Sequence, residues 1–326
     1  MLANVEISYI IVCYNSEKHI AKCLDSILDQ SHQSFEIIVV DNNSTDTTKL
    51  IVEKFCKKNK QARLISNLHN VGYGNAITIG LQNSNGEFLA ILNADAFLDK
   101  DWASNMLKIF KSNSEIMSAS GTILFPNGEL QTTGGMMDRY GAIVQRDSSI
   151  FNSRNIGTNV FFYNDGSCFM LRRRILEETS FDPNLFLYYE DVDLSWKIHM
   201  LGFKIGHVKE AISYHDSGQS LYDVNPSKFY YLAKNRLYVC TKNYSTQKTL
   251  SRVLVSIFLV FLNSVIYDIT KSPKGYIKSF FRAISWNMKH LGLIMSEQKR
   301  LNATRKITQE ELDRYLVPKS IELALL

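Results

Sequence analysis

The chain of 326 residues has few of the residues that cross-link or interrupt a fold. It contains five cysteines and five prolines, and the scattered cysteines form no Cys-x-x-Cys pair. Their odd number and spacing argue against a disulfide framework and a structural zinc site, so we expect a reducing, cytoplasmic compartment. Hydrophobic residues make up 45% and charged residues 21% of the chain, which excludes a disordered protein and indicates a globular one.

Several familiar signals are also missing from the sequence. Neither G-x-G-x-x-G nor G-x-x-x-x-G-K-[ST] occurs, which excludes the dinucleotide fingerprint and the P-loop, and no internal repeat is visible. The first basic residue is Lys18, and Glu6 stands where a signal peptide would carry positive charge. We therefore expect no signal peptide at this end of the sequence.

The net charge of +5 is unevenly distributed along the chain. Residues 1–220 carry a balance of −5 and residues 221–326 a balance of +10. A basic tail on a mildly acidic body indicates an anionic partner, which is either nucleic acid or a membrane surface.

Apolar segments of two kinds alternate through residues 7–110. The predicted strands are 7–13, 35–40, 63–65 and 88–92, and the predicted helices are 20–28, 47–58, 76–81 and 102–110. This alternation predicts an α/β fold with a doubly wound, mostly parallel sheet. We expect one domain over 1–240, with halves at about 1–115 and about 116–240. Residues 241–326 are expected to form a helical, basic, membrane-associated region.

Polar residues end three of these strands and fill one glycine-containing loop. They are Tyr14, Asn15, Asp41, Asn43, Asn93, Ala94 and Asp95 at the strand ends, with Asn70, Gly74 and Asn75 in the loop 70–76. Turn chemistry explains any one of these segments alone. In doubly wound sheets, however, ligands bind beyond the carboxyl ends of the strands, so the coincidence of all four predicts a binding site there.

Three carboxylates occupy four positions in the segment 187–196. Glu190, Asp191 and Asp193 precede a helical pattern, where they could simply cap the helix as solvated charges. Three acids among bulky apolar residues exceed what a cap needs, and a carboxylate held there could accept a proton from an incoming hydroxyl. We expect Glu190, Asp193 and Trp196 to contact the acceptor or support the site.

His215 follows a strand-like segment. A lone histidine is most often a loop or core residue, but with Asp95 it forms a candidate metal site. Combined with Asp95, it gives one carboxylate and one imidazole, which favours Mn²⁺, whereas an oxygen shell would favour Mg²⁺. One carboxylate leaves room for diphosphate oxygens in the shell.

Six short motifs follow one another along the chain. They are Ile-Ile-Val-Cys-Tyr-Asn (10–15), Val-Val-Asp-Asn-Asn-Ser-Thr-Asp (39–46), Asn-Val-Gly-Tyr-Gly-Asn-Ala (70–76), Leu-Asn-Ala-Asp (92–95), Tyr-Glu-Asp-Val-Asp-Leu (189–194) and His-Asp-Ser-Gly-Gln-Ser (215–220). In this order they resemble the motifs of family 2 glycosyltransferases, in their rhamnosyltransferase-like branch. The resemblance covers residues 5–240 and implies a catalytic domain over 1–240, with a nucleotide-binding half at about 1–115 and an acceptor half at about 116–240. It implies a GT-A (nucleotide-diphospho-sugar transferase) fold, a nucleotide-sugar donor, a divalent metal (Mn²⁺ or Mg²⁺) and inversion at the anomeric carbon.

The resemblance also implies roles for individual residues. Asp41 would hold the nucleotide base, Asp95 would be the metal-binding end of a D-x-D-type motif whose first acid is here Asn93, and Asp191 would be the catalytic base. His215 would contact the metal or the diphosphate. Gly166 lies in the segment 165–170, which resembles the one that lines the donor-sugar and acceptor pocket. Lys234 and Arg236 would face the diphosphate or be solvated helix charges.

The most apolar run, 253–267, lies between Arg252 and Asp268 and is shorter than the ~20 residues that span a bilayer. Composition alone favours a buried core helix. Basic residues interleaved with aromatic ones follow over 271–289, which is typical of a helix at a membrane surface. No nucleic-acid motif is present. We therefore expect peripheral attachment to the cytoplasmic face of the membrane, which suits a lipid-linked acceptor.

The predicted function is an inverting hexosyltransferase of polysaccharide or glycan biosynthesis. One alternative is a non-catalytic nucleotide-sugar-binding scaffold at the membrane, which would have no need for Asp95, Asp191 and His215 together. Another is a sugar nucleotidyltransferase, which needs a glycine-rich basic loop after its first strand. Residues 13–17 contain neither a glycine nor a basic residue.

Overall fold

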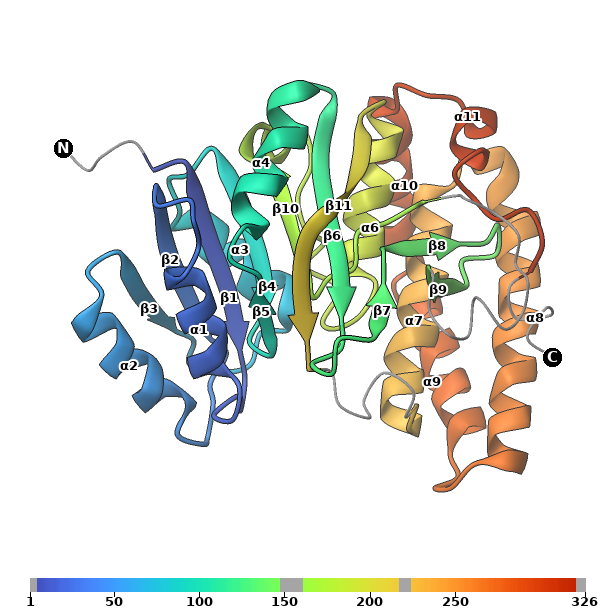
Figure 1. Cartoon of the computed structure of the whole chain (residues 1–326). Coiled ribbons are helices and arrows are strands. Elements are labelled where there is room, and N and C mark those ends of the chain that lie inside the picture. Colours follow the sequence, from blue (N-terminus) through green and yellow to red (C-terminus); the bar gives the residue numbers. More distant parts are fainter. Residues whose placement is uncertain (1–4, 147–160, 217–223, 321–326) are drawn as a thin grey trace.

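The computed structural model describes residues 5–146, 161–216 and 224–320 (Figure 1). The catalytic part expected from the sequence contains these strands: β1 Ile7–Cys13, β2 Phe35–Asp41, β3 Ala62–Ser66, β4 Phe88–Asn93, β5 Ala96–Leu98, β6 Ile116–Leu124, β7 Leu130–Thr132, β8 Gly135–Met137, β9 Ile143–Gln145, β10 Cys168–Arg172 and β11 Lys204–His215. Its helices are α1 Ile20–Leu28, α2 Thr48–Lys58, α3 Tyr73–Gln82, α4 Trp102–Ser112 and α6 Glu190–Met200, with a 3₁₀ turn over Arg173–Glu177.

The main sheet has the order β3-β2-β1-β4-β10-β6-β11-β5, with β7 added to β6. The strands β3, β2, β1 and β4 are parallel, as the alternating pattern predicts. Beyond β4 the sheet becomes mixed, because β10 runs antiparallel to both β4 and β6, while β11 is parallel to β6. The α/β class is therefore confirmed, and the segment 116–172, which shows little pattern in the sequence, supplies the central antiparallel strand.

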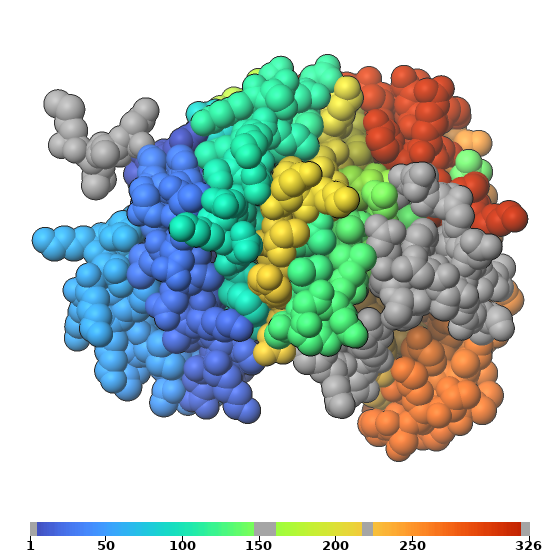
Figure 2. Space-filling view, in the orientation of Figure 1, coloured from blue at the N-terminus to red at the C-terminus, as the bar shows by residue number. Residues whose placement is uncertain are grey.

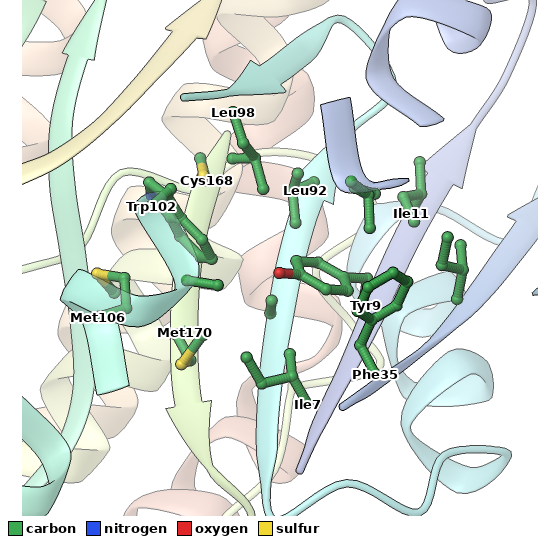
Figure 3. Close-up of a cluster of buried hydrophobic side chains, with 14 of the residues drawn as sticks. Ile7, Tyr9, Ile11, Phe35, Leu92, Leu98, Trp102, Met106, Cys168 and Met170 are labelled. Carbon is green, nitrogen blue, oxygen red and sulfur yellow. The ribbon is translucent and has the colours of Figure 1, made fainter. Parts of the chain in front are cut away.

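Helices cover both faces of the sheet, which explains why the strands are apolar throughout. Alternate residues of β1 belong to two different clusters: Tyr9 and Ile11 pack toward α1, α2 and α4, and Ile10 and Val12 toward α3 and α6. Figure 3 shows part of the first cluster, in which Tyr9 lies beside Phe35 with ring centroids 5.5 Å apart. Burial on both faces requires continuous apolar strands rather than alternating ones.

The C-terminal part is helical. Its helices are α7 Pro226–Asn243, α8 Thr246–Thr270, α9 Tyr276–Lys289, α10 Leu291–Thr304 and α11 Gln309–Asp313. The expected boundary between residues 240 and 241 falls inside α7. In Figure 2 the orange helices of this region extend from the lower edge of the molecule.

The alternative of a buried core helix over 253–267, which composition alone favours, does not agree with the structure. The helix α8 has 25 residues, and only 22% of its most apolar 18-residue window is buried. By length and composition it could cross a membrane, with a mean hydropathy of 2.0. The helix α8 extends beyond both charged residues that bound the apolar run, so both charges lie within the helix. Both charges have partners: Arg252 pairs with Asp313 of α11, and Asp268 accepts hydrogen bonds from the first backbone N–H groups of α9.

Candidate functional site

The carboxyl ends of β1, β2 and β4 meet at one edge of the sheet, as predicted. Cys13 pairs with Asp41, and Val12 pairs with Asn93, so the polar residues that follow these strands are neighbours. The strand β11 ends at the same edge, because His215 pairs with Ala96 of β5. The topology therefore gathers four chain segments that are far apart in the sequence.

The loops after β1 and β2 are tied together by side chains. Asn15 has a left-handed backbone (φ 51°), and its Oδ1 accepts a hydrogen bond from the backbone N–H of Thr45 at 2.8 Å. Asp41 is buried, and its carboxylate accepts from the N–H of Ser44 at 3.3 Å. Asn43 is exposed with a φ of 69°, and Tyr14 is half exposed. These contacts form the predicted site edge.

Asn42 is a structural residue of this edge that the sequence analysis missed. Its buried amide donates to Asn70 Oδ1 at 2.9 Å, and its Oδ1 accepts from Asn67 and from the N–H of Val71, both at 3.1 Å. Asn42 therefore fixes the start of the 70–76 loop against β2. Its position between Asp41 and Asn43, two residues expected at the site, is the feature of the sequence from which Asn42 could have been predicted.

The 70–76 loop packs against residues 181–190. Gly72 has a φ of 88°, and a Cβ there would lie 2.5 Å from the backbone oxygen of Phe186, so only glycine fits. Gly74 faces Glu190, and Asn75 donates to the carbonyl of Pro183 at 3.2 Å. The amide of Asn75 therefore serves to hold this packing. The loop therefore connects the strand edge to the acidic segment.

Asp95 and His215 come together as predicted. His215 Nε2 lies 3.3 Å from Asp95 Oδ1, and Asn93 Nδ2 lies 3.5 Å from the same nitrogen. Burial lowers the pKa of His215, but the hydrogen bond and charge of Asp95 outweigh burial and raise it. Gln131, which the sequence analysis missed, lies 3.3 Å from His215 Nδ1 and orients the ring.

The Asp95–His215 pair fits a divalent cation by its chemistry, with one carboxylate and one imidazole directed at each other. The side chain of Asp95 remains 33% exposed, so the pair is accessible from outside. Among the described residues, no group of three or more His, Cys, Asp or Glu side chains gathers as a metal site. Any ion here would need further oxygens from a ligand. Residues 217–220 of the sixth motif lie outside the described residues.

Asp191 is partly buried and Glu190 is buried at the start of α6. Asp191 accepts hydrogen bonds from the N–H of Gly166 at 2.9 Å and of Val192 at 2.8 Å. Burial, followed by the charge of Asp165, raises the pKa of Asp191 to about 7. Burial and the charge of Asp191 raise the pKa of Glu190 to about 8. Within the described part of the chain, Glu190 Oε2 is buried with no hydrogen-bond partner.

The charges of four acidic residues act on the hydroxyl of Tyr73. Burial raises the pKa of Tyr73 well above its usual value, and the charges of Glu190, Asp191, Asp95 and Asp165 add to this effect. The Tyr73 hydroxyl donates to the carbonyl of Gly166 at 3.0 Å. The same segment donates from the Gly166 N–H to Asp191 and accepts at Ser167 from the N–H of Asn93 at 2.9 Å, so it joins the strand edge to the start of α6.

The interpretation of Asp193 as a solvated helix cap is wrong. Its side chain is completely buried and lies 2.8 Å from both Lys197 Nζ and Lys242 Nζ. Burial raises the pKa of Asp193, but the two lysines outweigh burial and lower it. Trp196 is also completely buried, with its ring centroid 4.7 Å from that of Tyr244. Both residues therefore support the site from behind and do not face an acceptor.

Lys234 and Arg236 are not solvated helix charges. Both side chains are buried: Lys234 Nζ donates to the carbonyl of Asn184 at 2.9 Å, and Arg236 Nε donates to the carbonyl of Tyr140 at 3.0 Å. Burial lowers the pKa of Lys234 to about 8. These side chains join α7 to neighbouring loops.

Two consecutive tyrosines before α6 have left-handed backbones, which no pattern in the sequence predicts. Tyr188 and Tyr189 have φ values of 68° and 71°. Asn235 of α7 donates to the carbonyls of Leu187 and Tyr188 at 2.8 and 2.7 Å, and the Tyr189 hydroxyl donates to the carbonyl of Gly141 at 2.8 Å. Such backbone strain persists only where the surroundings enforce it.

Comparison with known sequences identifies relatives. The sequence model of the family described as "Glycosyl transferase family 2" matches residues 8–180, just over half of the 326 residues. A poly-beta-1,6-N-acetyl-D-glucosamine synthase of Staphylococcus epidermidis is 26% identical over 215 residues, which cover 63% of this chain and 48% of that protein. An uncharacterized glycosyltransferase of Haemophilus influenzae is 33% identical over 118 residues, 36% of each chain. The chain spans about half the length, or less, of these relatives.

Solved structures share the fold. TarS residues 1–349 of Staphylococcus aureus in complex with UDP superimposes with a TM-score of 0.55 and 18% identity over 95% of this chain and 89% of that one. GalNAc-T7 with UDP, GalNAc and Mn²⁺ superimposes with a TM-score of 0.62 and 18% identity, over 87% of this chain and 57% of that one. The mannosyltransferase PcManGT of Pyrobaculum calidifontis with GDP-Man and Mn²⁺ superimposes with a TM-score of 0.55 and 16% identity, over 92% of this chain and 85% of that one. These likenesses confirm the predicted GT-A-type fold, but the comparisons do not specify the rhamnosyltransferase-like branch.

Proposed function

This chain belongs to glycosyl transferase family 2, and from that premise we propose that it is an inverting hexosyltransferase. It would move a sugar from a nucleotide-diphosphate sugar to a hydroxyl of a glycan or lipid-linked acceptor. The observation that carries the proposal is that one segment contacts both the strand edge and the acidic segment. The N–H of Gly166 donates to Asp191 at 2.9 Å, and the carbonyl of the next residue, Ser167, accepts from the N–H of Asn93 at 2.9 Å, two positions before Asp95. A base and a diphosphate-binding group must be neighbours for one displacement to use both.

The donor would bind along the edge formed by the ends of β1, β2 and β4. Asp41, buried at the end of β2, would accept hydrogen bonds from the nucleotide base. Asp95 and His215 are 3.3 Å apart, and they would hold a divalent cation, Mn²⁺ or Mg²⁺, together with diphosphate oxygens. Such a cation would neutralise the negative charge of the leaving diphosphate.

Asp191 would be the general base. It would take the proton of the acceptor hydroxyl while that oxygen bonds to the anomeric carbon and the bond to the diphosphate breaks. One displacement inverts the anomeric configuration and releases the nucleoside diphosphate. The pKa of about 7 suits this task, because the carboxylate is ionised near neutral pH and still basic enough to accept a proton.

We further propose that the C-terminal part attaches the protein to the cytoplasmic face of a membrane. The +10 charge balance after residue 220 and the exposed apolar helix α8 support this proposal. A peripheral position would give access to a lipid-linked acceptor. Because one relative is a poly-beta-1,6-N-acetyl-D-glucosamine synthase, UDP-N-acetylglucosamine is the first donor to test.

A panel of nucleotide sugars tests the function in two independent ways. Each compound is added with Mn²⁺, Mg²⁺ or EDTA, and the melting temperature and the release of nucleoside diphosphate are measured. A true donor raises the melting temperature, because it binds only the folded chain. We expect EDTA to abolish turnover and Mn²⁺ to restore it at least as well as Mg²⁺.

The outcomes separate the parts of the proposal. Full turnover with metal chelated would contradict the metal assignment alone. Stabilisation by a donor without turnover on any acceptor would support the non-catalytic scaffold. Asp95→Asn should lose the metal-dependent part of the stabilisation, whereas Asp99→Asn, near the same strands but outside the pair, should keep it.

A further inference from the structure

A groove of about 540 Å³ lies on the C-terminal helices, apart from the acidic site. Its lining residues are Tyr230 of α7 and Lys278, Phe281, Arg282, Ser285, Trp286 and Lys289 of α9. The spacing of the α9 residues places them on one face of that helix. Figure 1 shows α9 beside α7 and α8 at the end of the molecule opposite α2.

The groove is strongly basic. Lys278, Arg282 and Lys289 have no carboxylate partner in the described part of the chain, and Arg282 lies over the ring of Tyr230 at 4.7 Å. No acidic residue occurs between Asp268 and Glu297. Asp268 itself is occupied, because its oxygens accept from the backbone N–H groups of Gly275, Tyr276 and Ile277. The groove therefore presents three positive charges without a counterion.

The surroundings of the groove are apolar and exposed. Phe281 is 59% exposed and Met288 71% exposed on α9 itself. On the neighbouring α8, the exposed large apolar residues are Leu250, Leu254, Val255, Phe258, Phe261 and Ile269. Exposed apolar surface on this scale marks an interaction site rather than ordinary solvent contact.

We propose that this groove binds the phosphate headgroup of an anionic phospholipid, with the exposed face of α8 and Phe281 against the adjoining acyl chains. The inference rests on the proposed membrane attachment and names its lipid class and its binding site. Arginine presents a planar set of donors that matches phosphate oxygens, and lysine adds point charge. Tryptophan and tyrosine have an apolar body and a polar end, which suits the level of the headgroups.

Charge complementarity selects this occupant over others. A second copy of the chain would bring its own groove with the same three positive charges. A purely apolar partner would leave the three charges without counterions. A free phosphate would satisfy the charges but not the exposed apolar residues beside them. An anionic lipid in a bilayer satisfies both surfaces at once.

The experiment uses the fluorescence of the full-length protein. The chain has three tryptophans, of which Trp102 and Trp196 are completely buried and Trp286 lines the groove. Vesicles of phosphatidylcholine alone, or mixed with phosphatidylglycerol, carry brominated acyl chains that quench tryptophan at short range. Sedimentation of the same mixtures measures binding. We expect binding and quenching only with phosphatidylglycerol, both weakening as salt rises.

Two matched triple variants decide whether the groove is responsible. Lys278→Gln/Arg282→Gln/Lys289→Gln should weaken binding about 100-fold, because each basic residue near an anionic surface contributes ~1 kcal/mol. Lys54→Gln/Lys57→Gln/Lys58→Gln on α2 removes the same charge from exposed positions and should stay within about twofold of the parent. Trp286→Phe should remove most of the quenchable signal while binding persists.

Each contrary result overturns the inference. Equal binding by the two triple variants would mean a diffuse attraction to the basic surface. Equal binding to neutral and anionic vesicles would mean apolar insertion alone. Loss of vesicle binding in millimolar inorganic phosphate, at matched ionic strength, would mean a soluble phosphate site. If the parent protein fails to sediment with any vesicle, the membrane proposal fails as well, whereas stabilisation by nucleotide sugars still reports on glycosyl transfer.

Discussion

Asp191 differs from its two acidic neighbours in what surrounds it. Glu190 Oε2 is buried with no hydrogen-bond partner among the described residues, and Asp193 lies between two lysines. Only Asp191 is both hydrogen-bonded to the Gly166 segment and close to the Asp165 charge. A carboxylate held in place with a pKa near neutrality is the one best able to exchange a proton during turnover.

We predict that Asp191→Asn keeps donor affinity and loses transfer. A lost base typically lowers the rate ~10²–10⁴-fold, and the loss should fall on kcat and leave the donor KM unchanged. In the parent protein, kcat should rise as pH increases through about 7, since the base must be ionised. Glu190→Gln separates the two neighbouring acids: if Asp191 is the base, Glu190→Gln lowers kcat much less than Asp191→Asn does. Near-normal turnover in Asp191→Asn would remove Asp191 from the role of base.

The same variant tests the pKa through stability. Burial raises the pKa of Asp191 from 3.8 to about 7, so the folded chain loses stability as pH rises between these values. Asparagine does not ionise, so the stability of Asp191→Asn relative to the parent should rise between pH 4 and pH 8, by up to about 4 kcal/mol in unfolding free energy at ~1.4 kcal/mol per pKa unit. Because asparagine has one acceptor oxygen for two N–H groups, the measured quantity is this change with pH and not the difference at one pH. A stability difference that stays the same at both pH values would contradict the shift.

At the scale of the element, the start of α6 depends on α7. The Asn235 amide bridges two carbonyls of the left-handed turn that precedes Asp191. Without it, two buried carbonyl groups lose their donor, and each loss costs about 1–3 kcal/mol. The turn would then relax toward ordinary backbone angles and shift the base.

We predict that Asn235→Ala lowers both the melting temperature and kcat, with the donor KM little changed. Adding Tyr188→Gly to Asn235→Ala should recover part of the melting temperature and part of kcat, because glycine adopts the φ of 68° without steric cost. A stability loss with full kcat would show that the turn does not position Asp191. Failure of the glycine to recover either quantity would show that the backbone angle is not what Asn235 maintains.

The sequence was sufficient where local pattern decides the structure and insufficient where distant residues do. Strands β1, β2 and β4 were predicted because both faces are buried, and the Asp95–His215 pair because both follow strands at one edge. β10 was missed because its place between β4 and β6 is set by long-range pairing. Asp193 resembles a helix cap until Lys242, far along the chain, is found beside it.

At the scale of the whole molecule, buried charges join the C-terminal helices to the catalytic part. Lys242 of α7 lies 2.8 Å from Asp193 and also pairs with Asp182, and all three side chains are buried. Removing one member of such a cluster leaves an uncompensated charge, which typically costs about 3–5 kcal/mol. A chain shortened near Lys242 would also lose Tyr244, which packs on Trp196.

We therefore predict that Lys242→Met destabilises the whole protein by about 3–5 kcal/mol, measured by chemical denaturation. Lys248→Met, an exposed lysine at the start of α8, should change stability by less than about 0.5 kcal/mol. A truncation after Lys242 should fail to fold, so loss of membrane binding in it would be uninformative. Equal stability of the two methionine variants would contradict a structural role for the cluster.

The helix α7 contacts both the groove and the turn before α6, so it sets the distance between a bound membrane and the catalytic site. Tyr230, at the groove, and Asn235, at the turn before Asp191, lie five positions apart on this helix, which corresponds to about 7.5 Å of rise. With a lipid headgroup in the groove, the membrane contact and the turn before Asp191 would lie within about two turns of one helix. The length of the arm between an acceptor's lipid and its free hydroxyl would then select substrates, independently of which sugars that arm contains.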